Sequence, residues 1–360
     1  MKELLERLLA VPGLSGHEDR IRLVISNELE TLGLTHNTDP LGNLWTTFEG
    51  GGPSIMLFTH MDQLGFIVRK IEADGFLRLT RLGGVPERAL ASQEIVVSTS
   101  DGDVPGIIAN KSHHATPPDE KYKVVPVDYV YVDCGFESAA EAEAAGIRIG
   151  SPVVYAPGSV ALGENRIAAS ALDDRAGCAV LIEVCQALAQ RECGPTIHLA
   201  FTTQEEFNLR GALPLAQRLK PDMAIQIDLM LTSDTPDMSD LGEMRLGCGP
   251  GVSLYSFHAR GTLNGVIPHP AMVRLFEETA EAEGIPLQRS AQKGVLTDLS
   301  YVQLVGGGVA SIDVGFPLRY SHSSREVVDF RDLHGLRDLL LAALGRVGPD
   351  FSLSRDGEGA

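Results

Sequence analysis

The segment FTTQEEFNLRG, residues 201–211, places two glutamates side by side directly after an apolar, β-branched run. Two adjacent like charges at the end of a strand are unfavourable for folding unless solvent, a group of opposite charge or a metal ion compensates them. Glu205 and Glu206 therefore raise the question of what chemistry a pair of carboxylates performs at this position.

Five further histidine and acidic residues follow predicted strands or begin a predicted helix. They are His60 and Asp62 in LFTHMDQLG, Asp173 in ALDDRAG, Asp228 in AIQIDLM and His322 in RYSHSSREVV. Neutral imidazole and carboxylate oxygen are ligands that suit zinc, cobalt or manganese. One carboxylate can also bridge two ions that lie about 4 Å apart. The set has the composition of a two-metal site.

Each of these residues has a simpler explanation when it is taken alone. A histidine at a strand end is commonly a structural hydrogen-bond partner, and Asp173 with Asp174 could cap a helix with an acidic first turn. The glutamate pair could lie in a solvated loop, Asp228 could be a turn residue, and His322 could lie on the surface. Together they favour a site, because the ends of parallel strands meet at one edge of a sheet.

Strands and helices alternate on both sides of a central segment of different character. Apolar residues at three- and four-residue spacing predict a helix over 18–32 that stops at Gly33. The other predicted elements are a strand over 54–62, a helix over 173–190, a strand over 196–203, a helix after Arg210 and a strand over 223–228. This alternation predicts an α/β fold with a doubly wound, mixed and mostly parallel sheet.

The central segment, residues 67–162, reads instead as short strands separated by Gly, Pro and Asp, with one short helix that begins at a Ser138/Glu141 capping box. We therefore expect a small β-rich domain inserted into an α/β catalytic domain of residues 1–66 and 163–350, followed by a flexible tail over 351–360. His113 and His114 are expected to lie in a loop of the insert.

Composition and charge exclude several classes of protein. The chain has 360 residues, 44% of them hydrophobic, which is typical of a globular protein. Its net charge of -18 disfavours a nucleic-acid partner and an anionic membrane. The N-terminus lacks the continuous apolar stretch of a signal peptide, so a cytoplasmic location is expected. The five cysteines include no CxxC pair and are expected to be reduced thiols.

The motifs THMDQLG, ALDDRAG, TQEEFNLRGA, AIQIDL and YSHSSREVV occur in an order and spacing that resemble the M42 family of di-metal aminopeptidases. That family includes glutamyl aminopeptidases and proteins once labelled endoglucanases. The resemblance runs nearly end to end: it also covers VPGLSGHE and DPLGNLW near the N-terminus, and GIIANK and SAAEAEAAGIRIGSPVV in the insert. Five separated motifs make it specific.

The resemblance implies two divalent metal ions per chain, either Zn, Co or Mn. Asp173 resembles the bridging carboxylate. His60 and Glu206 would complete the shell of one metal, and Asp228 and His322 would complete that of the other. In related metallopeptidases a cis peptide follows the bridging aspartate, so a cis bond is expected between Asp173 and Asp174.

Two further residues would assist the reaction without coordinating a metal ion. Glu205 resembles the general base that takes a proton from the attacking water and returns it to the leaving amine. Asp62 lies two residues beyond His60, on the same face of an extended strand, and resembles the carboxylate that fixes the tautomer of that imidazole.

The implied function is a metallo-aminopeptidase that removes N-terminal residues from short peptides. A large homo-oligomer, a tetrahedral dodecamer with interior active sites, is expected. One alternative is a non-catalytic metal-binding assembly protein, although the intact Glu205 counts against it. A glycoside hydrolase is a weaker alternative, because two adjacent glutamates cannot readily flank a glycosidic bond.

The chain departs from the family pattern at a few positions. Gln63 stands where an acidic residue is common after the His-x-Asp motif, and Phe207 and Asn208 replace the usual small pair after the glutamates. None of these changes removes a ligand, so they bear on the preferred substrate. No preference can be named, but the net charge is expected to slow the encounter with acidic peptides.

Overall fold

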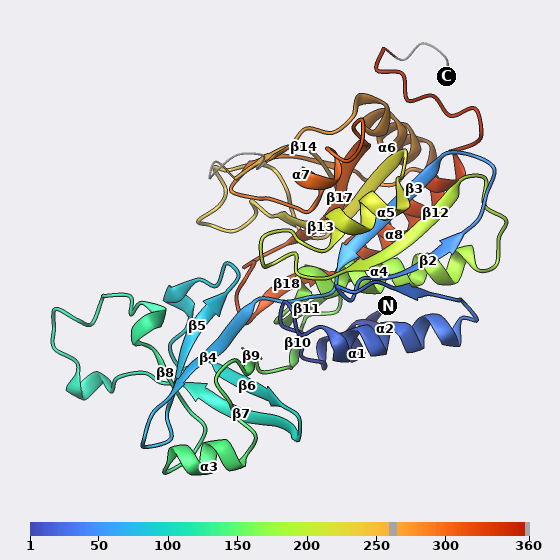
Figure 1. Cartoon of the computed structure of the whole chain (residues 1–360). Coiled ribbons are helices and arrows are strands. Elements are labelled where there is room, and N and C mark those ends of the chain that lie inside the picture. The colour runs from blue at the N-terminus through green and yellow to red at the C-terminus, as the bar shows by residue number, and fades with distance from the viewer. Residues whose placement is uncertain (259–264, 357–360) are drawn as a thin grey trace.

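The largest element in the computed structural model, which describes residues 1–258 and 265–356, is a nine-stranded mixed sheet (Figure 1). Its strand order is β1-β2-β12-β3-β13-β17-β14-β15, with β16 paired to β14. The central strands β12, β3, β13 and β17 run parallel to one another. The strands are β1 (Asn37–Thr38), β2 (Leu44–Phe48), β3 (Ser54–His60), β12 (Thr196–Thr202), β13 (Met223–Leu231), β14 (Gly251–Phe257), β15 (Gly265–Val266), β16 (Gln288–Lys293) and β17 (Ala310–Leu318).

Strand β3 is buried on both faces of this sheet. Ile55 and Leu57 point into the main hydrophobic core, whereas Met56 and Phe58 point into a smaller core on the opposite face. Successive side chains of a strand alternate between faces, so a continuous apolar run is what a strand covered on both sides requires. His60 comes at the end of this run and is therefore held by rigid backbone.

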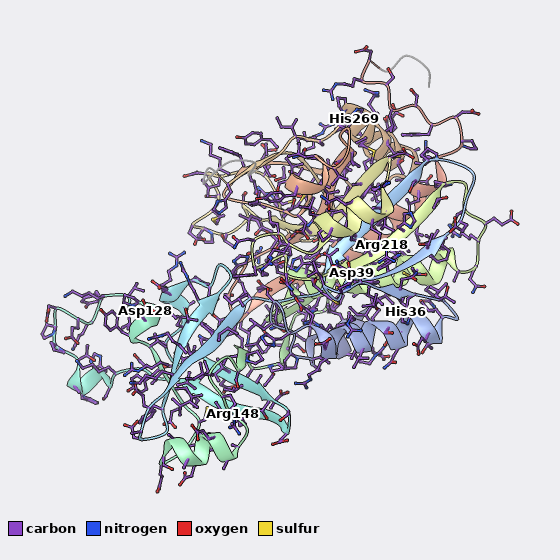
Figure 2. The ribbon with its side chains drawn as sticks, in the orientation of Figure 1. His36, Asp39, Asp128, Arg148, Arg218 and His269 are labelled. Atoms are coloured by element: carbon purple, nitrogen blue, oxygen red, sulfur yellow. The ribbon has the colours of Figure 1, made fainter. Side chains whose placement is uncertain are left out.

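Helices cover both faces of the large sheet. On one face lie α4 (Leu172–Leu188), α6 (Pro270–Glu283) and α8 (Phe330–Gly345), with α1 (Lys2–Leu9) and α2 (Asp19–Thr31) packed against α4; on the other lie α5 (Ala212–Leu219) and α7 (Leu299–Val302). Figure 2 labels Arg218 of α5 in the part of the molecule that holds the large sheet. The guanidinium of Arg218 lies 5.0 Å from the ring centroid of Trp45. The arrangement is the predicted doubly wound fold.

Helix α2 shows how the sequence sets these helices. Ile21, Ile25 and Leu29 recur every fourth residue and are completely buried, which is the stripe that a core-facing helix presents. Gly33 has a φ of 74°, and the N–H of Leu34 donates to the carbonyl of Leu29 (3.0 Å). The helix therefore ends in a left-handed glycine turn, close to the predicted boundary.

A closed six-stranded barrel lies at one end of the molecule, away from α6 and the C-terminal segment (Figure 1). Its strands follow one another in the order β4-β5-β8-β7-β6-β9 and surround a separate hydrophobic core. They are β4 (Gly65–Ile71), β5 (Leu77–Leu82), β6 (Glu94–Thr99), β7 (Gly102–Ile108), β8 (Tyr131–Asp133) and β9 (Pro152–Tyr155). Helix α3 (Ala139–Ala144) and the 3-10 turns η1 (Glu87–Ala89), η2 (His113–Ala115) and η3 (Val127–Tyr129) lie in the connections.

The connections of the barrel agree with the predictions made from the sequence. The Ser138 hydroxyl accepts the N–H of Glu141 at the start of α3 (3.3 Å). The expected capping box closes slightly differently, because Glu141 reaches back to the N–H of Glu137. His113 and His114 are exposed in the β7–β8 connection, as expected.

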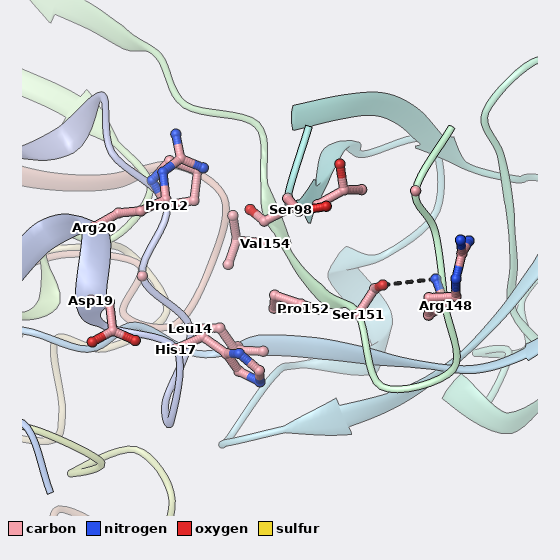
Figure 3. A pocket seen from close by; sticks show the side chains of 14 residues that line it. Pro12, Leu14, His17, Asp19, Arg20, Ser98, Arg148, Ser151, Pro152 and Val154 are labelled. Atoms are coloured by element: carbon pink, nitrogen blue, oxygen red, sulfur yellow. Dashed lines mark hydrogen bonds between the residues drawn. The ribbon is translucent and has the colours of Figure 1, made fainter. Parts of the chain in front are cut away.

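An ion pair joins the barrel to helix α2. The Arg20 guanidinium of α2 donates to Asp103 of β7 (2.6 Å), and a groove of about 410 Å³ lies beside this pair. Figure 3 shows the groove between the segment that carries Pro12 and His17 and the barrel residues Ser98, Ser151 and Arg148, whose N–H donates to the Ser151 hydroxyl. The groove contains none of the candidate metal donors.

A small three-stranded sheet, β10-β11-β18, completes the fold. Its strands are β10 (Ser159–Leu162), β11 (Arg166–Ala169) and β18 (Glu326–Asp329). Part of the expected tail is described: Phe351 and Leu353 pack against the main core, while residues 357–360 lie outside the described residues. Within the described residues, no helix is both long and apolar enough to cross a membrane.

Candidate metal centre

The candidate residues all lie at the carboxyl edge of the central parallel strands or beside it. His60 ends β3, and Glu205 and Glu206 follow the end of β12. Asp228 lies in the second half of β13, and His322 follows β17. Because these strands are parallel, their carboxyl ends share one edge of the sheet. Helix α4 brings Asp173 to the same edge.

Two groups of donor atoms share Asp173. His60, Asp173 and Asp228 form one group, and Asp173, Glu206 and His322 form the other; within each group the possible ligand atoms lie within 4.8 Å of one another. Asp173 Oδ1 lies 3.1 Å from His60 Nε2, and Asp173 Oδ2 lies 3.4 Å from His322 Nε2. Each carboxylate oxygen of Asp173 thus faces a different group, which is the arrangement of a bridging ligand.

The pairing of the other donors differs from the sequence-based expectation. His60 groups with Asp228, not with Glu206, and His322 groups with Glu206, not with Asp228. Strands β3 and β13 are direct neighbours in the sheet, so their ends lie side by side. Of the two glutamates, Glu205 faces His60 Nε2 (4.0 Å) and Glu206 faces His322 Nε2 (3.8 Å), because consecutive side chains point in different directions.

Asp62 is a buried carboxylate beside His60 and the backbone of Glu205 and Glu206. Its Oδ1 lies 3.3 Å from His60 Nδ1, which leaves Nε2 directed at Asp173. The N–H of Glu205 donates to Asp62 Oδ1 (3.0 Å), the N–H of Glu206 donates to Oδ2 (3.1 Å), and the Ser15 hydroxyl donates to the same carboxylate. Asp62 therefore contacts both the imidazole and the backbone that carries the two glutamates.

His322 is oriented from two sides. Its Nδ1 lies 3.1 Å from the carbonyl oxygen of Gly84, and its backbone N–H donates to Glu326 Oε1 (2.6 Å). A carbonyl oxygen only accepts, so Nδ1 carries the proton and Nε2 of the neutral ring keeps a free lone pair. The second oxygen of Glu326 accepts the N–H of Asp173 (3.1 Å), so one buried glutamate fixes the backbone of two donors.

The remaining donors are also held by buried partners. Gln226 Nε2 donates to Asp228 (3.0 Å), and the Thr59 hydroxyl donates to Asp174. The peptide bond between Asp173 and Asp174 is cis, as predicted. These contacts present the donor oxygens in fixed directions.

The electrostatics of the site fit divalent cations. Burial lowers the pKa values of His60 and His322, but carboxylates around them outweigh burial and leave both pKa values well above the ordinary histidine value. Burial, and then neighbouring carboxylates, raise the pKa of Glu206 to about 7 and that of Asp228 well above its usual range. The protein alone holds an excess of negative charge here, which bound cations would balance.

One buried atom supports the same fit. Glu206 Oε1 is buried without a hydrogen-bond partner among the described residues. A buried carboxylate oxygen without a donor is unfavourable, whereas a cation beside it would satisfy it. The residues therefore fit a metal centre in donor type, distance and charge.

A cleft of about 670 Å³ opens over the donor groups. Four of the five candidate donors, all but His60, line the cleft together with Glu205. Its lining also includes the neutral side chains of Leu209, Leu229, Leu231, Val295, Leu296 and Tyr301. Asn208, one of the departures from the family pattern, lines the cleft, whereas Gln63 is buried beneath it and accepts the N–H of Gly13 (3.1 Å). The cleft is large enough for the end of a peptide.

Several residues that contact the donors, or the backbone that leads into the two glutamates, were not expected from the sequence. They are Glu326, Gln226, Gly84 and Glu18. Gln226 offered a signal, since it lies two residues before Asp228 in an otherwise apolar strand and so shares its face. Glu326 and Gly84 offered none, because their contacts exist only in the folded chain.

Comparisons with known proteins agree with this site. A model of the M42 glutamyl aminopeptidase family matches residues 42–339. The protein SgcX of Escherichia coli strain K12 is 37% identical over 360 residues, which cover 99% of this chain and 96% of SgcX. The lysyl aminopeptidase of Pyrococcus furiosus is 31% identical, over 97% of this chain and 99% of its own.

Solved structures are similar over nearly the same length. An aminopeptidase of the archaeon Desulfurococcus kamchatkensis is 33% identical with a TM-score of 0.89, covering 97% of this chain and 95% of that one. The TET1 peptidase of Pyrococcus horikoshii, described as able to assemble into a tetrahedron or a large octahedral shell, is 28% identical with a TM-score of 0.87, covering 96% and 99%. Since the family model and relatives of matching length span the chain, it belongs to the M42 glutamyl aminopeptidase family, whose members use divalent metal, and is a metal-dependent aminopeptidase.

Proposed function

We propose that this chain removes the N-terminal residue from short peptides with the help of two divalent metal ions per chain. The observation that carries the proposal is that two donor groups share Asp173 on the floor of one cleft, with Glu205 beside them. The ligands would be His60, Asp173, Glu206, Asp228 and His322. Zinc, cobalt and manganese all accept this donor set.

When bound, such ions polarise a peptide carbonyl and lower the pKa of water. The chain itself supplies the base. Burial raises the pKa of Glu205 well above the ordinary glutamate value, although His60 opposes this. Its carboxylate lies in the cleft, where it would take the proton from the attacking water and return it to the leaving amine. Proton transfer of this kind contributes roughly 100- to 10,000-fold to the rate.

Elemental analysis after dialysis against Co or Zn tests the metal centre. We expect close to two ions per chain, fewer than one in Asp173→Asn because both groups lose a shared ligand, and about one in His322→Ala. His113→Ala, which changes an exposed histidine of the barrel, is the matched control and should keep both ions. A wild-type chain that binds none under saturating metal would overturn the proposal.

Release of p-nitroaniline from a panel of aminoacyl substrates, with and without chelator, tests the reaction. Glu205→Gln should lower turnover by roughly 100- to 10,000-fold while the metal content stays at the wild-type value, because the amide keeps the size of the side chain but cannot accept a proton. A wild-type chain that binds metal but releases nothing would support a non-catalytic assembly protein instead. Neither that alternative nor a glycoside hydrolase is favoured by the relatives found by sequence, which are named as aminopeptidases.

The domain organisation, the assembly and the location belong to the same proposal. Residues 67–162 would form the inserted domain and residues 1–66 with 163–350 the catalytic domain, which the separate core of the barrel supports. The chain would assemble into a large homo-oligomer, a tetrahedron by analogy with the TET1 peptidase. A cytoplasmic location is supported by five cysteines that are all unpaired.

A further inference from the structure

Two buried carboxylates hold three consecutive backbone amides in front of the metal donors. Asp62 accepts the N–H groups of Glu205 (3.0 Å) and Glu206 (3.1 Å). Glu18 Oε1 accepts the N–H of Gln204 (3.0 Å) across 186 positions of sequence. We call residues 204–206 the glutamate turn. Its three amides are all bound by side chains from the N-terminal quarter of the chain.

The carboxyl group of Glu18 lies in an environment that disfavours its charged form. Only 5% of its surface is exposed, and its other hydrogen bond comes from the N–H of Gly16 (2.8 Å). No Lys or Arg within the described residues forms a salt bridge with it. Burial, reinforced by the charge of Asp62, raises the pKa of Glu18 to about 7. A buried carboxylate without a salt bridge costs stability, and its hydrogen bonds from backbone amides offset part of that cost.

The glutamate turn needs such a partner. Gln204 has a φ of 55°, in the left-handed region that is unfavourable for a residue with a side chain. This conformation sits between the end of β12 and Glu205, and it sets the direction in which the Glu205 side chain leaves the backbone. The hydrogen bond from the N–H of Gln204 to Glu18 stabilises this left-handed conformation at the first residue of the turn.

We infer that Glu18 is a positioning residue: its carboxylate fixes the backbone of Gln204 and thereby aims the Glu205 carboxylate into the cleft. The inference rests on the proposed role of Glu205 as the base. Glu18 binds the amide that precedes Glu205, and Asp62 binds the amides of Glu205 and Glu206. The two carboxylates therefore fix the backbone before and after the proposed base. Glu18 itself does not reach the cleft.

A matched pair of substitutions isolates the acceptor oxygen. Glu18→Gln keeps the side-chain length and one acceptor oxygen, whereas Glu18→Met has a similar volume and no oxygen. We expect Glu18→Met to lower kcat by about 10- to 100-fold, the range found for groups that orient a functional residue, with KM within about threefold of wild type. Glu18→Gln should restore at least a third of the wild-type kcat. Both should keep the wild-type metal content.

A double substitution distinguishes positioning from a general structural role. If Glu18 acts through Glu205, Glu18→Met should cause no further loss of kcat when it is added to Glu205→Gln, because the group that it aims is already absent. If Glu18 only stabilises the fold, the two losses should multiply. Residual activity of the double variant is measured with high enzyme concentration and the best aminoacyl p-nitroanilide.

Each outcome has a defined meaning. Multiplying losses, a wild-type kcat in Glu18→Met, or a loss of metal in that variant would overturn the inference. An inactive Glu205→Gln beside a fully active Glu18→Met would overturn only the role of Glu18 and leave the proposed function standing. An active Glu205→Gln would overturn the assignment of the base, and the inference with it.

Discussion

At the scale of single residues, Asp62 connects His60 to the glutamate turn, residues 204–206. Its carboxylate faces His60 Nδ1 on one side and accepts the N–H groups of Glu205 and Glu206 on the other. The side chain is completely buried. An error in its position would therefore move the imidazole and the two glutamates together.

Asp62→Asn should lower kcat/KM by about 10- to 100-fold and weaken metal binding, because the amide keeps one acceptor oxygen and places an NH₂ group against a backbone N–H. Steady-state kinetics with metal titration measures both effects. Asp103→Asn changes a barrel carboxylate that pairs with Arg20 and accepts the Ser98 hydroxyl, contacts nothing in the candidate site, and serves as the control. Wild-type kinetics in Asp62→Asn would remove Asp62 from the site.

The donors could be predicted from the sequence because their residue types follow recognisable strands. Which donors share an ion could not, since that depends on which strands are neighbours: β3 lies beside β13, and no motif records this. Glu18 and Glu326 were missed for a related reason. They act on backbone amides far away in sequence, and a backbone amide has no sequence signature.

At the scale of elements, strands β14 and β17 of the large sheet are paired over only part of their length. The two strands pair only at Gly251–Gly315 and Val252–Val314. Beyond these pairs lies a polar cavity of about 20 Å³, lined among others by Ser253, Ser256 and Asp313. Asp313 accepts one hydrogen bond, from the Thr297 hydroxyl (2.9 Å), and its second oxygen is buried without a partner among the described residues.

Asp313 should make stability depend on pH. Burial raises its pKa to about 7 from an ordinary value of 3.8. Ionisation is therefore harder in the folded chain, and the associated stability is present below pH 4 and lost as the pH rises through 7. Asp313→Asn cannot ionise, so the variant should gain up to about 2–3 kcal/mol on the wild type between pH 5 and pH 8.

Urea unfolding of both chains with chelator present measures this difference without contributions from bound metal. A stability difference that stays constant between pH 5 and pH 8 would contradict the prediction. Thr297→Val, which removes the single donor to Asp313, should have the opposite effect and steepen the loss of stability with pH.

The predicted elements agree with the structure where local pattern decides them. The strands at 54, 196 and 223 and the helices at 18 and 173 begin within one residue of the predicted positions. Strand β13 runs to Leu231, three residues past the predicted end, because its pairing with β17 continues to Leu318. The β10-β11-β18 sheet was not predicted, since it joins strands more than 150 residues apart.

At the scale of the whole molecule, the barrel exposes large apolar side chains. Tyr122 and Tyr129 are 95% and 72% exposed, and Ile107, Val124 and Val125 are each more than half exposed. Clusters of this kind mark interaction surfaces. Similar structures described as tetrahedra support a homo-oligomer as the covering partner.

Static light scattering at micromolar concentration should therefore give a mass many times the 38.6 kDa of one chain. Tyr129→Glu should lower that mass by placing a charge in the expected interface. Leu23→Glu, on an exposed position of α2, is the control and should leave it unchanged. A wild-type chain that scatters as a monomer would refute assembly.

The charge of the whole chain bears on the substrate. The net charge is -18, and the described lining of the cleft contains no Lys or Arg. A leucyl p-nitroanilide should therefore exceed the glutamyl one in kcat/KM by about tenfold or more, which corresponds to 1.4 kcal/mol, and added salt should narrow the difference. A profile in which glutamyl substrates are best would contradict this. The names of the relatives differ in substrate, since one is a lysyl aminopeptidase and another a glutamyl aminopeptidase.

The contact between the carbonyl of Gly84 and His322 Nδ1 limits how the chain can be divided. Gly84 belongs to the connection after β5, so a loop of the barrel delivers the acceptor that orients a donor of the large sheet. A shortened chain without the barrel would keep every ligand residue but lose this acceptor. In engineering, the barrel is therefore not an exchangeable module: a graft from another protein must also reproduce one carbonyl at the rim of the cleft.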